Sequence, residues 1–325
     1  MLVTYKQSMN DYFNYLDLKR KKSSCRTIKN RLTNYLLKYV DEEAYVNDLT
    51  TFEYLKIQSQ INELNLSNSY KRTIHTCIVT YLNFCRKFYG LQENVASWVG
   101  NFSRSNEIVL GHIWSLEEFY QFIDVVDEYV YKIFFTFLYF SGVRLGEALG
   151  LSFKNVDFEI GTIYVVDNLT RFIENGKKVK STTKTRTSTR EIGLDQFTLD
   201  LLKQLQRYYI ENYNNYSEEF YVFGGTIPLA PTTIDRKKRQ WCELANVQYI
   251  KNHEFRHSHA CLLFENNIPI KDIAERLGHA KPSMTLDIYL RYRHKDEKRV
   301  LHTLNSLQQN YCNRISTSWQ CQYTN

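Results

Sequence analysis

The sequence predicts a mainly α-helical protein of two domains, in which a helical bundle precedes an α-rich domain that holds a small antiparallel β-sheet. Three observations support this fold class. Apolar residues recur at helical spacing through the first hundred residues. A polar connector follows, and a segment rich in Val, Ile and Thr later interrupts the helices between 162 and 194. With 325 residues, 43% of them hydrophobic, the chain is long enough to bury two cores.

The first domain is expected to cover residues 1–92 and to contain helices at about 5–18, 25–40, 50–64 and 70–90. One apolar stripe runs along the last of these helices, and Gly90 ends it. The stripe consists of Ile74, Cys77, Ile78, Tyr81, Leu82, Cys85 and Phe88. The opposite faces of the bundle carry basic residues, namely Arg26, Lys29, Arg31, Lys71 and Arg72.

The second domain is expected at residues 111–300, after a linker at 93–110 and before a tail at 301–325. Ser115 and Glu118 have the spacing of a capping box at the start of its first helix. Helices then dominate to about residue 155 and resume after Asp195. Strands are expected at 162–168, 177–185 and 189–194, with Asn-Gly at 175–176 as a hairpin turn signal.

Composition narrows the class of protein. The start, MLVTYKQSMNDYF, has no apolar run behind a basic segment, so no signal peptide is expected. The densest apolar run, at 133–140, is too short to span a bilayer. The seven cysteines are scattered and form no C-x-x-C pair, which favours reduced thiols. A soluble, cytoplasmic protein is therefore expected.

Positive charge gathers in two places within a chain of formal net charge +7. Residues 171–190 hold seven basic residues and one acidic residue, and 236–239 read RKKR. Such segments are typical of a surface that meets nucleic-acid phosphates. Charge alone leaves the alternative of a solvated face open.

The segment 253–260 (HEFRHSHA) contains the H-E-x-x-H pattern of zinc peptidases. A peptidase would also need a third ligand at a suitable spacing. Neither His259 nor His279 lies at a known downstream spacing for that motif. A zinc site is therefore not expected, and Arg256 becomes the residue of interest in this segment.

Four further residues stand out by their context. Arg144, in SGVRLGEALGL at 141–151, begins a helix, where the helix dipole disfavours a cation unless an anion is near. Lys184 lies on or near the basic hairpin, where Lys180 and Arg186 compete for any role. His279 follows Leu-Gly, and Tyr289 comes ten residues later. Alone, each has an ordinary explanation, since Tyr289 is one of 25 tyrosines.

Together and in this order, these motifs resemble the catalytic set of the tyrosine recombinases, the phage-type integrases and their relatives. The resemblance covers about 105–300, with Phe255 and Ser258 in place of the usual Leu and Thr. It implies that 1–92 is a core-binding domain and 111–300 a catalytic domain. Helices begin near residue 5, so the arm-binding domain of many integrases is expected to be absent. The implied catalytic residues are Arg144, Lys184, His253, Arg256, His279 and Tyr289.

The reaction that the resemblance implies needs no metal ion and no cofactor. Tyr289 attacks a DNA phosphorus and forms a 3′-phosphotyrosyl link while the 5′ oxygen leaves. Arg144 and Arg256 grip the non-bridging oxygens with planar forks, and His279 donates a further hydrogen bond. His253 accepts the proton of the phenol, and Lys184 supplies one to the leaving oxygen.

The implied partner is double-stranded DNA. Four protomers are expected in the synapse, and the free protein is expected to be a monomer. Accessory candidates are an excisionase and a host DNA-bending protein. The expected function is integration or excision of a mobile element. The alternatives are a resolvase of chromosome or plasmid multimers and an inactive DNA-binding protein. Expected DNA contacts are Arg26, Lys29, Arg31, Lys71, Arg72, Lys177, Lys178, Arg186, Lys237, Lys238 and Arg239.

The tail contains one more helical pattern, at 298–307. Val300, Leu301, Leu304 and Leu307 form an apolar face along it. Two interpretations stay open: the face docks on a neighbouring protomer, as the resemblance implies, or it folds back on its own core.

Overall fold

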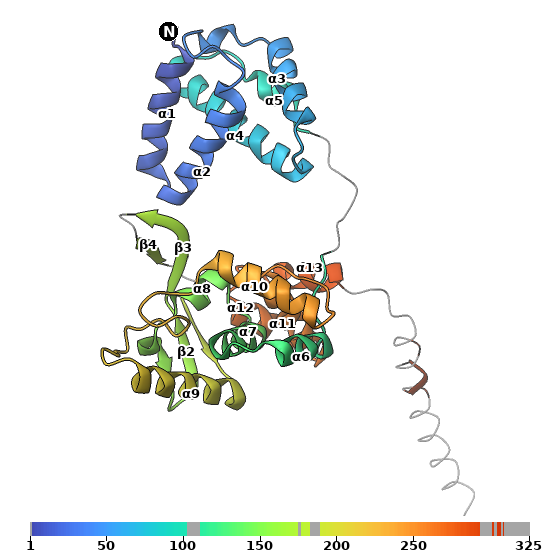
Figure 1. The fold of residues 1–325 in the computed structure, drawn as a ribbon. Coiled ribbons are helices and arrows are strands. Elements are labelled where there is room, and N and C mark those ends of the chain that lie inside the picture. Colours follow the sequence, from blue (N-terminus) through green and yellow to red (C-terminus); the bar gives the residue numbers. More distant parts are fainter. Residues whose placement is uncertain are drawn as a thin grey trace, which may run out of the picture. The chain divides into compact units, whose positions relative to one another are not determined.

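The computed structural model divides into two compact units, Met1–Val109 and Leu110–Asn325, each of which is considered by itself (Figure 1). It describes residues 2–102, 111–174, 177–182 and 189–292, together with 301, 304–306 and 308. The chain is mainly helical with a small antiparallel sheet, as the sequence predicted. Within the described residues, we find no helical segment with the length and apolar character that a membrane span requires.

The first unit is a bundle of five α-helices in its described part. Thr50 and Ser67 cap two of them with their hydroxyl groups, and Gly90 ends the longest with a left-handed φ of 72°. The elements are α1 (Tyr5–Lys19), α2 (Lys22–Leu32) with a π-helical turn at Thr33–Leu37, a 3₁₀ turn at Val46–Asp48, α3 (Thr51–Glu63), α4 (Asn68–Tyr89) and α5 (Val95–Val99).

The core of this bundle agrees with the predicted apolar stripe of α4 except at one end. Ile74, Tyr81 and Cys85 are buried, whereas Phe88 is 51% exposed and was wrongly assigned to the stripe. The expected linker is also partly structured. Helix α5 lies within it, and Asn94 donates a hydrogen bond to the Val79 carbonyl of α4 at 2.9 Å.

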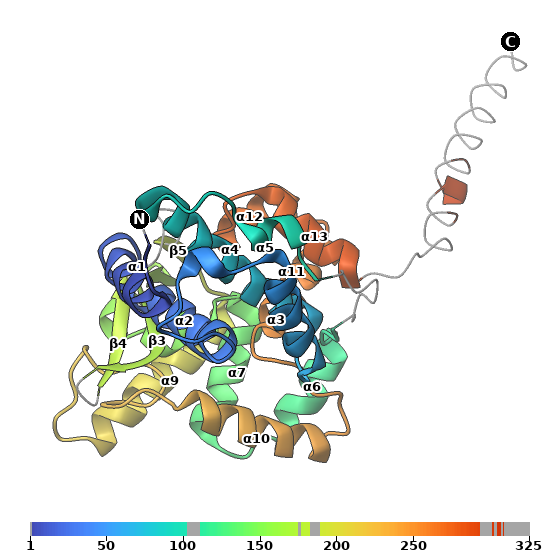
Figure 2. The ribbon, with the colours of Figure 1, turned by 90° about the horizontal axis from the view of Figure 1, so that it is seen from above.

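The second unit packs around α7, a helix whose Phe134, Phe135 and Phe137 side chains are buried among its neighbours. The capping box predicted at Ser115 and Glu118 is present at the start of α6. In Figure 2, α11, α12 and α13 lie together, and these three helices pack on one another. The helices are α6 (Leu116–Val125), α7 (Tyr129–Ser141), α8 (Leu145–Gly150), a 3₁₀ turn at Phe153–Asn155, α9 (Gln196–Asn212), α10 (Pro231–Leu244), α11 (Glu254–Glu265), α12 (Ile270–Leu277) and α13 (Pro282–Tyr292).

The strands form two antiparallel groups. Strands β1 (Val156–Asp157), β2 (Thr162–Val165) and β5 (Arg190–Gly193) make one sheet in the order β1-β2-β5. Strands β3 (Asp167–Glu174) and β4 (Lys177–Thr182) make a two-stranded ribbon. Glu174 pairs with Lys177, so two residues connect these strands, as the Asn-Gly signal predicted.

One strand differs from its prediction. The single strand expected at 162–168 is divided between β2, which pairs with β5, and β3, which pairs with β4. Gly150 helps to explain the division, because a Cβ there would lie 3.3 Å from the Leu169 backbone nitrogen. Its missing side chain lets β3 pass close to the end of α8.

Candidate active site

Arg144 lies immediately before α8 and is held by a carboxylate. Its backbone nitrogen donates to Glu147 Oε2 at 2.9 Å, and its Nη1 donates to Glu147 Oε1 at 2.7 Å. Glu147 therefore supplies the anion that a cation at this helix start requires. The Arg144 side chain remains 34% exposed, so part of its guanidinium is accessible to a ligand.

Arg256 is almost completely buried on α11, with 1% of its surface exposed. Its Nη1 donates to the Gly142 carbonyl at 3.0 Å, and its Nη2 donates to the Leu277 carbonyl. Burial, then the positive charges of Arg144 and Arg190, lower the pKa of Arg256 to about 9. Clustered cations that repel one another form a site that an anion would stabilise.

Two histidines belong to the same cluster. His279 follows α12, and its Nδ1 lies 2.8 Å from Thr285 Oγ1. Burial, then Arg256 and Arg144, lower the pKa of His279 to about 4. The same three causes lower the pKa of His253, the residue that precedes α11. Both imidazoles are therefore neutral at neutral pH, so His253 is able to accept a proton.

Tyr289 lies on α13 and packs on a different part of α11. Its side chain is 8% exposed, and its ring packs on Phe264 with 3.6 Å between the centroids. Phe264 comes eight residues after Arg256, which is about two helical turns along α11. The structure thus brings together Arg144, His253, Arg256 and His279, whereas the ring contact of Tyr289 lies further along the helix.

Two predicted site residues, Lys184 and Arg186, lie outside the described residues. Lys177 and Lys178 lie on β4, where the backbone alone is described.

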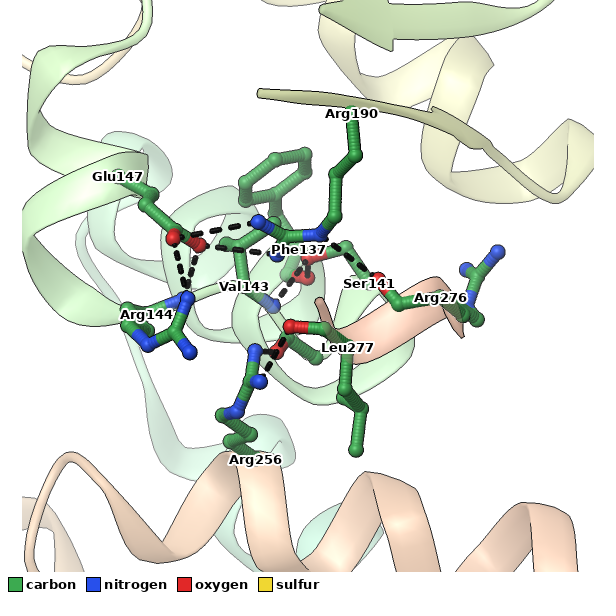
Figure 3. A network of polar contacts seen from close by, with 10 residues as sticks. Phe137, Ser141, Val143, Arg144, Glu147, Arg190, Arg256, Arg276 and Leu277 are labelled. Carbon is green, nitrogen blue, oxygen red and sulfur yellow. Dashed lines mark hydrogen bonds and ion pairs between the residues drawn. The ribbon is translucent and has the colours of Figure 1, made fainter. Parts of the chain in front are cut away.

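Three residues of the site were missed by the sequence reasoning: Glu147, Arg190 and Arg276. Arg190 bonds to Glu147 (Figure 3). Arg276 donates to the carbonyls of Gly193 and Phe140 at 3.0 and 3.2 Å. Glu147 stands three residues after Arg144, and this spacing was a usable signal. No local signal marked the two arginines, because their partners are distant in sequence.

The residues of the H-E-x-x-H pattern make other contacts. His253 and His257 pack edge to face, with 4.7 Å between their rings, and His257 Nδ1 lies 3.2 Å from Tyr292 Oη. Glu254 accepts a hydrogen bond from the Lys251 backbone. In the part of the chain that the structure describes, no three His, Cys, Asp or Glu side chains gather as a metal site would require.

Two basic residues that the sequence placed on DNA-facing surfaces are buried, which corrects those predictions. Lys71 donates to the Asn62 carbonyl at 2.6 Å, and Lys238 donates to Asn252 Oδ1 at 2.7 Å. Their long stems allow the ammonium groups to reach partners on other segments. Lys238 is 0% exposed, and burial lowers its pKa to about 8.

The remaining predicted DNA contacts whose side chains the structure describes differ in their exposure and partners. Arg26 is exposed, and Arg239 is exposed beside Asp235. Lys29 and Lys237 pair with Asp17 and Glu128. Arg31 lies over the ring of Tyr70, and Arg72 donates to the Phe102 carbonyl.

Comparison with known proteins identifies the family. Residues 115–298 match the sequence model of the phage integrase family, which is more than half of the chain. The chain belongs to the phage integrase family. The recombinase chemistry and the two-domain fold class that the sequence predicted are thereby confirmed: the protein is a tyrosine site-specific recombinase.

Two relatives match most of this chain. The ICEBs1 integrase of Bacillus subtilis (strain 168) is 26% identical over 287 residues, which cover 86% of this chain and 76% of the relative. The XerC-like tyrosine recombinase of Caldanaerobacter subterraneus subsp. tengcongensis is 26% identical over 324 residues, covering 91% and 81%.

Solved structures share the fold at low sequence identity. The Tn1549 transposon integrase in complex with a circular intermediate DNA has a TM-score of 0.71 at 17% identity, with 94% of this chain and 99% of that chain covered. A lambda integrase tetramer bound to a Holliday junction has a TM-score of 0.67 at 15% identity, with 91% and 80% covered.

Proposed function

We propose that this recombinase integrates and excises a mobile element, and that its catalytic residues are Arg144, Lys184, His253, Arg256, His279 and Tyr289. The observation that carries the proposal is the gathering of Arg144, Arg256 and two neutral histidines in one site. A phosphodiester is anionic, and its pentavalent transition state carries more negative charge on the non-bridging oxygens. Fixed cations therefore stabilise the transition state more than the ground state.

Hydrogen bonds within the protein fix the orientation of both guanidinium groups. A guanidinium has five N–H groups. Both Nη groups of Arg256 are oriented by the Gly142 and Leu277 carbonyls, and further N–H bonds of the guanidinium remain for a phosphate. Glu147 orients Arg144 in the same way. Because the forks are positioned before DNA binds, little reorganisation is needed when the charge develops.

The proposed step transfers a phosphoryl group to the phenol. The Tyr289 oxygen bonds to phosphorus as the bond from phosphorus to the 5′ oxygen breaks. His253 takes the phenolic proton, and Lys184 gives a proton to the 5′ oxygen. A 5′-hydroxyl from the partner strand then reverses the step, so that the strands are rejoined without ATP.

Tyr289 must reach the cations for this reaction, and its contact with Phe264 has to be released or rearranged.

Removal of the Lys184 amine should slow the cleavage of ordinary DNA far more than the cleavage of DNA with a 5′ sulfur leaving group. A thiolate leaves without the proton that an alkoxide requires.

Contacts with DNA phosphates are proposed for the basic residues that the structure does not bury. We further propose that four protomers assemble on the synapsed duplexes and that the free protein is a cytoplasmic monomer. The accessory partners would be an excisionase or a DNA-bending protein. The described tail residues Leu301 and Leu304 are exposed, which supports docking on a neighbouring protomer. The proposed contacts are Arg26, Lys29, Arg31, Arg72, Lys177, Lys178, Arg186, Lys237 and Arg239.

A multimer resolvase is the second candidate function. The length of the match to the XerC-like tyrosine recombinase favours it, because 91% of this chain is covered. The sites themselves separate the two functions. A resolvase recombines two copies of one site, whereas an integrase recombines two sites with different flanking sequences.

Covalent capture tests the chemistry. The protein is incubated in EDTA with a pool of duplexes that carry a randomised central segment and are lightly nicked by DNase I. Wild-type protein is expected to form an SDS-stable adduct, and Tyr289→Phe is expected to form none. Tyr292→Phe, a change of the same kind one turn further along α13, serves as the matched control. An undiminished adduct from Tyr289→Phe would refute the assignment of Tyr289 as the nucleophile, and the absence of an adduct from wild-type protein would favour an inactive DNA-binding protein.

A further inference from the structure

Arg190 begins β5 and directs its guanidinium at Glu147. Its Nη1 donates to Glu147 Oε1 at 3.2 Å, and its Nη2 donates to Glu147 Oε2 at 3.0 Å (Figure 3). Its Nε donates to the Arg276 carbonyl at 2.8 Å. The side chain is 7% exposed, so this arginine is held in one orientation within the protein.

Glu147 is therefore shared by two arginines. Arg144 bonds to the same carboxylate at 2.7 Å, and the Glu147 side chain is 3% exposed. Burial alone would raise the pKa of Glu147, but the hydrogen bond and charge of Arg190, followed by Arg144, hold it below its ordinary value. A buried carboxylate of this kind remains ionised only while its partners are present.

The net charge of Arg144, Arg190 and Glu147 sets the electrostatic attraction for a phosphate at this site. Two cations and one anion leave a single net positive charge beside the site. Without Arg190, the carboxylate would be balanced by Arg144 alone, and the net charge of the group would be zero. The attraction of Arg144 for an anionic transition state would then be largely cancelled.

We infer that Arg190 is a positioning residue of the recombinase, which shares the Glu147 carboxylate so that Arg144 is both oriented and left cationic toward the scissile phosphate. This inference rests on the proposed function. Arg190 acts through Glu147 and does not touch the DNA. The positive charge of Arg190 is needed only because Glu147 is negatively charged. A residue that served for packing alone would not depend on the charge of Glu147.

The test compares single-turnover adduct formation by full-length variants on a nicked duplex recovered from the randomised pool. Arg190→Met is expected to lower the rate at least about tenfold, because one fixed charge is lost from the site. The neutral change Glu147→Gln in the same chain should restore most of that loss. DNA affinity, measured by mobility shift, should stay close to that of wild type, since Arg190 makes no DNA contact.

A pH profile gives a readout that a merely structural role would not affect. In Arg190→Met, the Glu147 carboxyl loses its strongest partner, and its pKa rises. The rate relative to wild type should therefore improve as the pH falls and this carboxyl becomes protonated. Arg207→Met, on an exposed face of α9, is the matched control and should leave the rate unchanged.

If Arg190→Met does not fold, a second comparison still tests the inference. Arg190→Met in the Glu147→Gln background is then compared with Glu147→Gln alone, and the two rates should be nearly equal. Three outcomes would overturn the inference: an unchanged rate in Arg190→Met, a double variant no faster than Arg190→Met, or unequal rates in the Glu147→Gln background. Failure of the wild-type protein to form an adduct would instead overturn the proposed function.

Discussion

Gly142 offers a sharp test of how the site is built. It ends α7 with a φ of +65°, and its carbonyl accepts a hydrogen bond from Arg256. A Cβ at this position would lie 2.4 Å from His259 Cδ2 and 2.9 Å from Leu277 Cδ2. The His259 ring is unable to retreat freely, because its nitrogens lie 2.9 Å from the Tyr139 carbonyl and 3.0 Å from Arg276 Nε.

The expected loss of stability in Gly142→Ala has two parts. The left-handed backbone costs an alanine about 1–2 kcal/mol. Overpacking against a buried, bonded side chain adds about 1–3 kcal/mol, for a total of about 2–5 kcal/mol. Gly161→Ala, in the same unit, is the control, because φ is +69° and the nearest atom to its Cβ would be Leu199 Cδ2 at 3.4 Å. That variant should lose the backbone part alone.

Urea unfolding followed by tryptophan fluorescence measures the difference. Trp114 and Trp241 are buried in the second unit, whereas Trp98 of the first unit is 75% exposed. With an m-value of about 2 kcal/mol/M, Gly142→Ala should lower the midpoint by about 1–2.5 M and Gly161→Ala by about 0.5–1 M. Equal shifts for the two variants would refute the proposed contact between the Gly142 turn and the His259 ring.

Three further predictions concern single side chains. Tyr292→Phe should keep most of the covalent adduct on an SDS gel, whereas Tyr289→Phe should lose it; adduct from neither variant would point to a role for both phenols. Lys238 has a folded pKa of about 8, below its unfolded value, so its own contribution to stability should grow by about 1.5 kcal/mol from pH 8 to about 9.5. The difference in urea midpoint between wild type and Lys238→Met should therefore change over this range in favour of wild type; a constant difference would contradict the low pKa. Ser115→Ala should destabilise the second unit by about 1 kcal/mol, through loss of the helix cap, and an unchanged midpoint would contradict this.

Local features of the sequence account for most of the secondary structure that was predicted. Helix α4 and the capping box at Ser115 depend on residues within a few positions of one another, so a linear pattern records them. The division of the strand expected at 162–168 was missed, because it depends on which partners β2 and β3 find. Pairing partners lie far along the chain and leave no local pattern.

The candidate site shows the same distinction. Arg144, Arg256 and His279 were found from the sequence, since each is needed for one kind of chemistry and stands in a short motif. Arg190 was not found, because its meaning depends on Glu147, 43 positions away in the sequence.

The sequence by itself thus determined the helical class, the family and the residue types that the chemistry requires. Only the tertiary structure decided that Lys71 and Lys238 are buried, that Tyr289 packs on Phe264, and that two arginines share Glu147. The physical reason is that a long polar side chain takes its environment from whichever elements pack around it. Burial and hydrogen-bond partners are therefore properties of the assembled fold, whereas helix periodicity and capping belong to neighbouring residues.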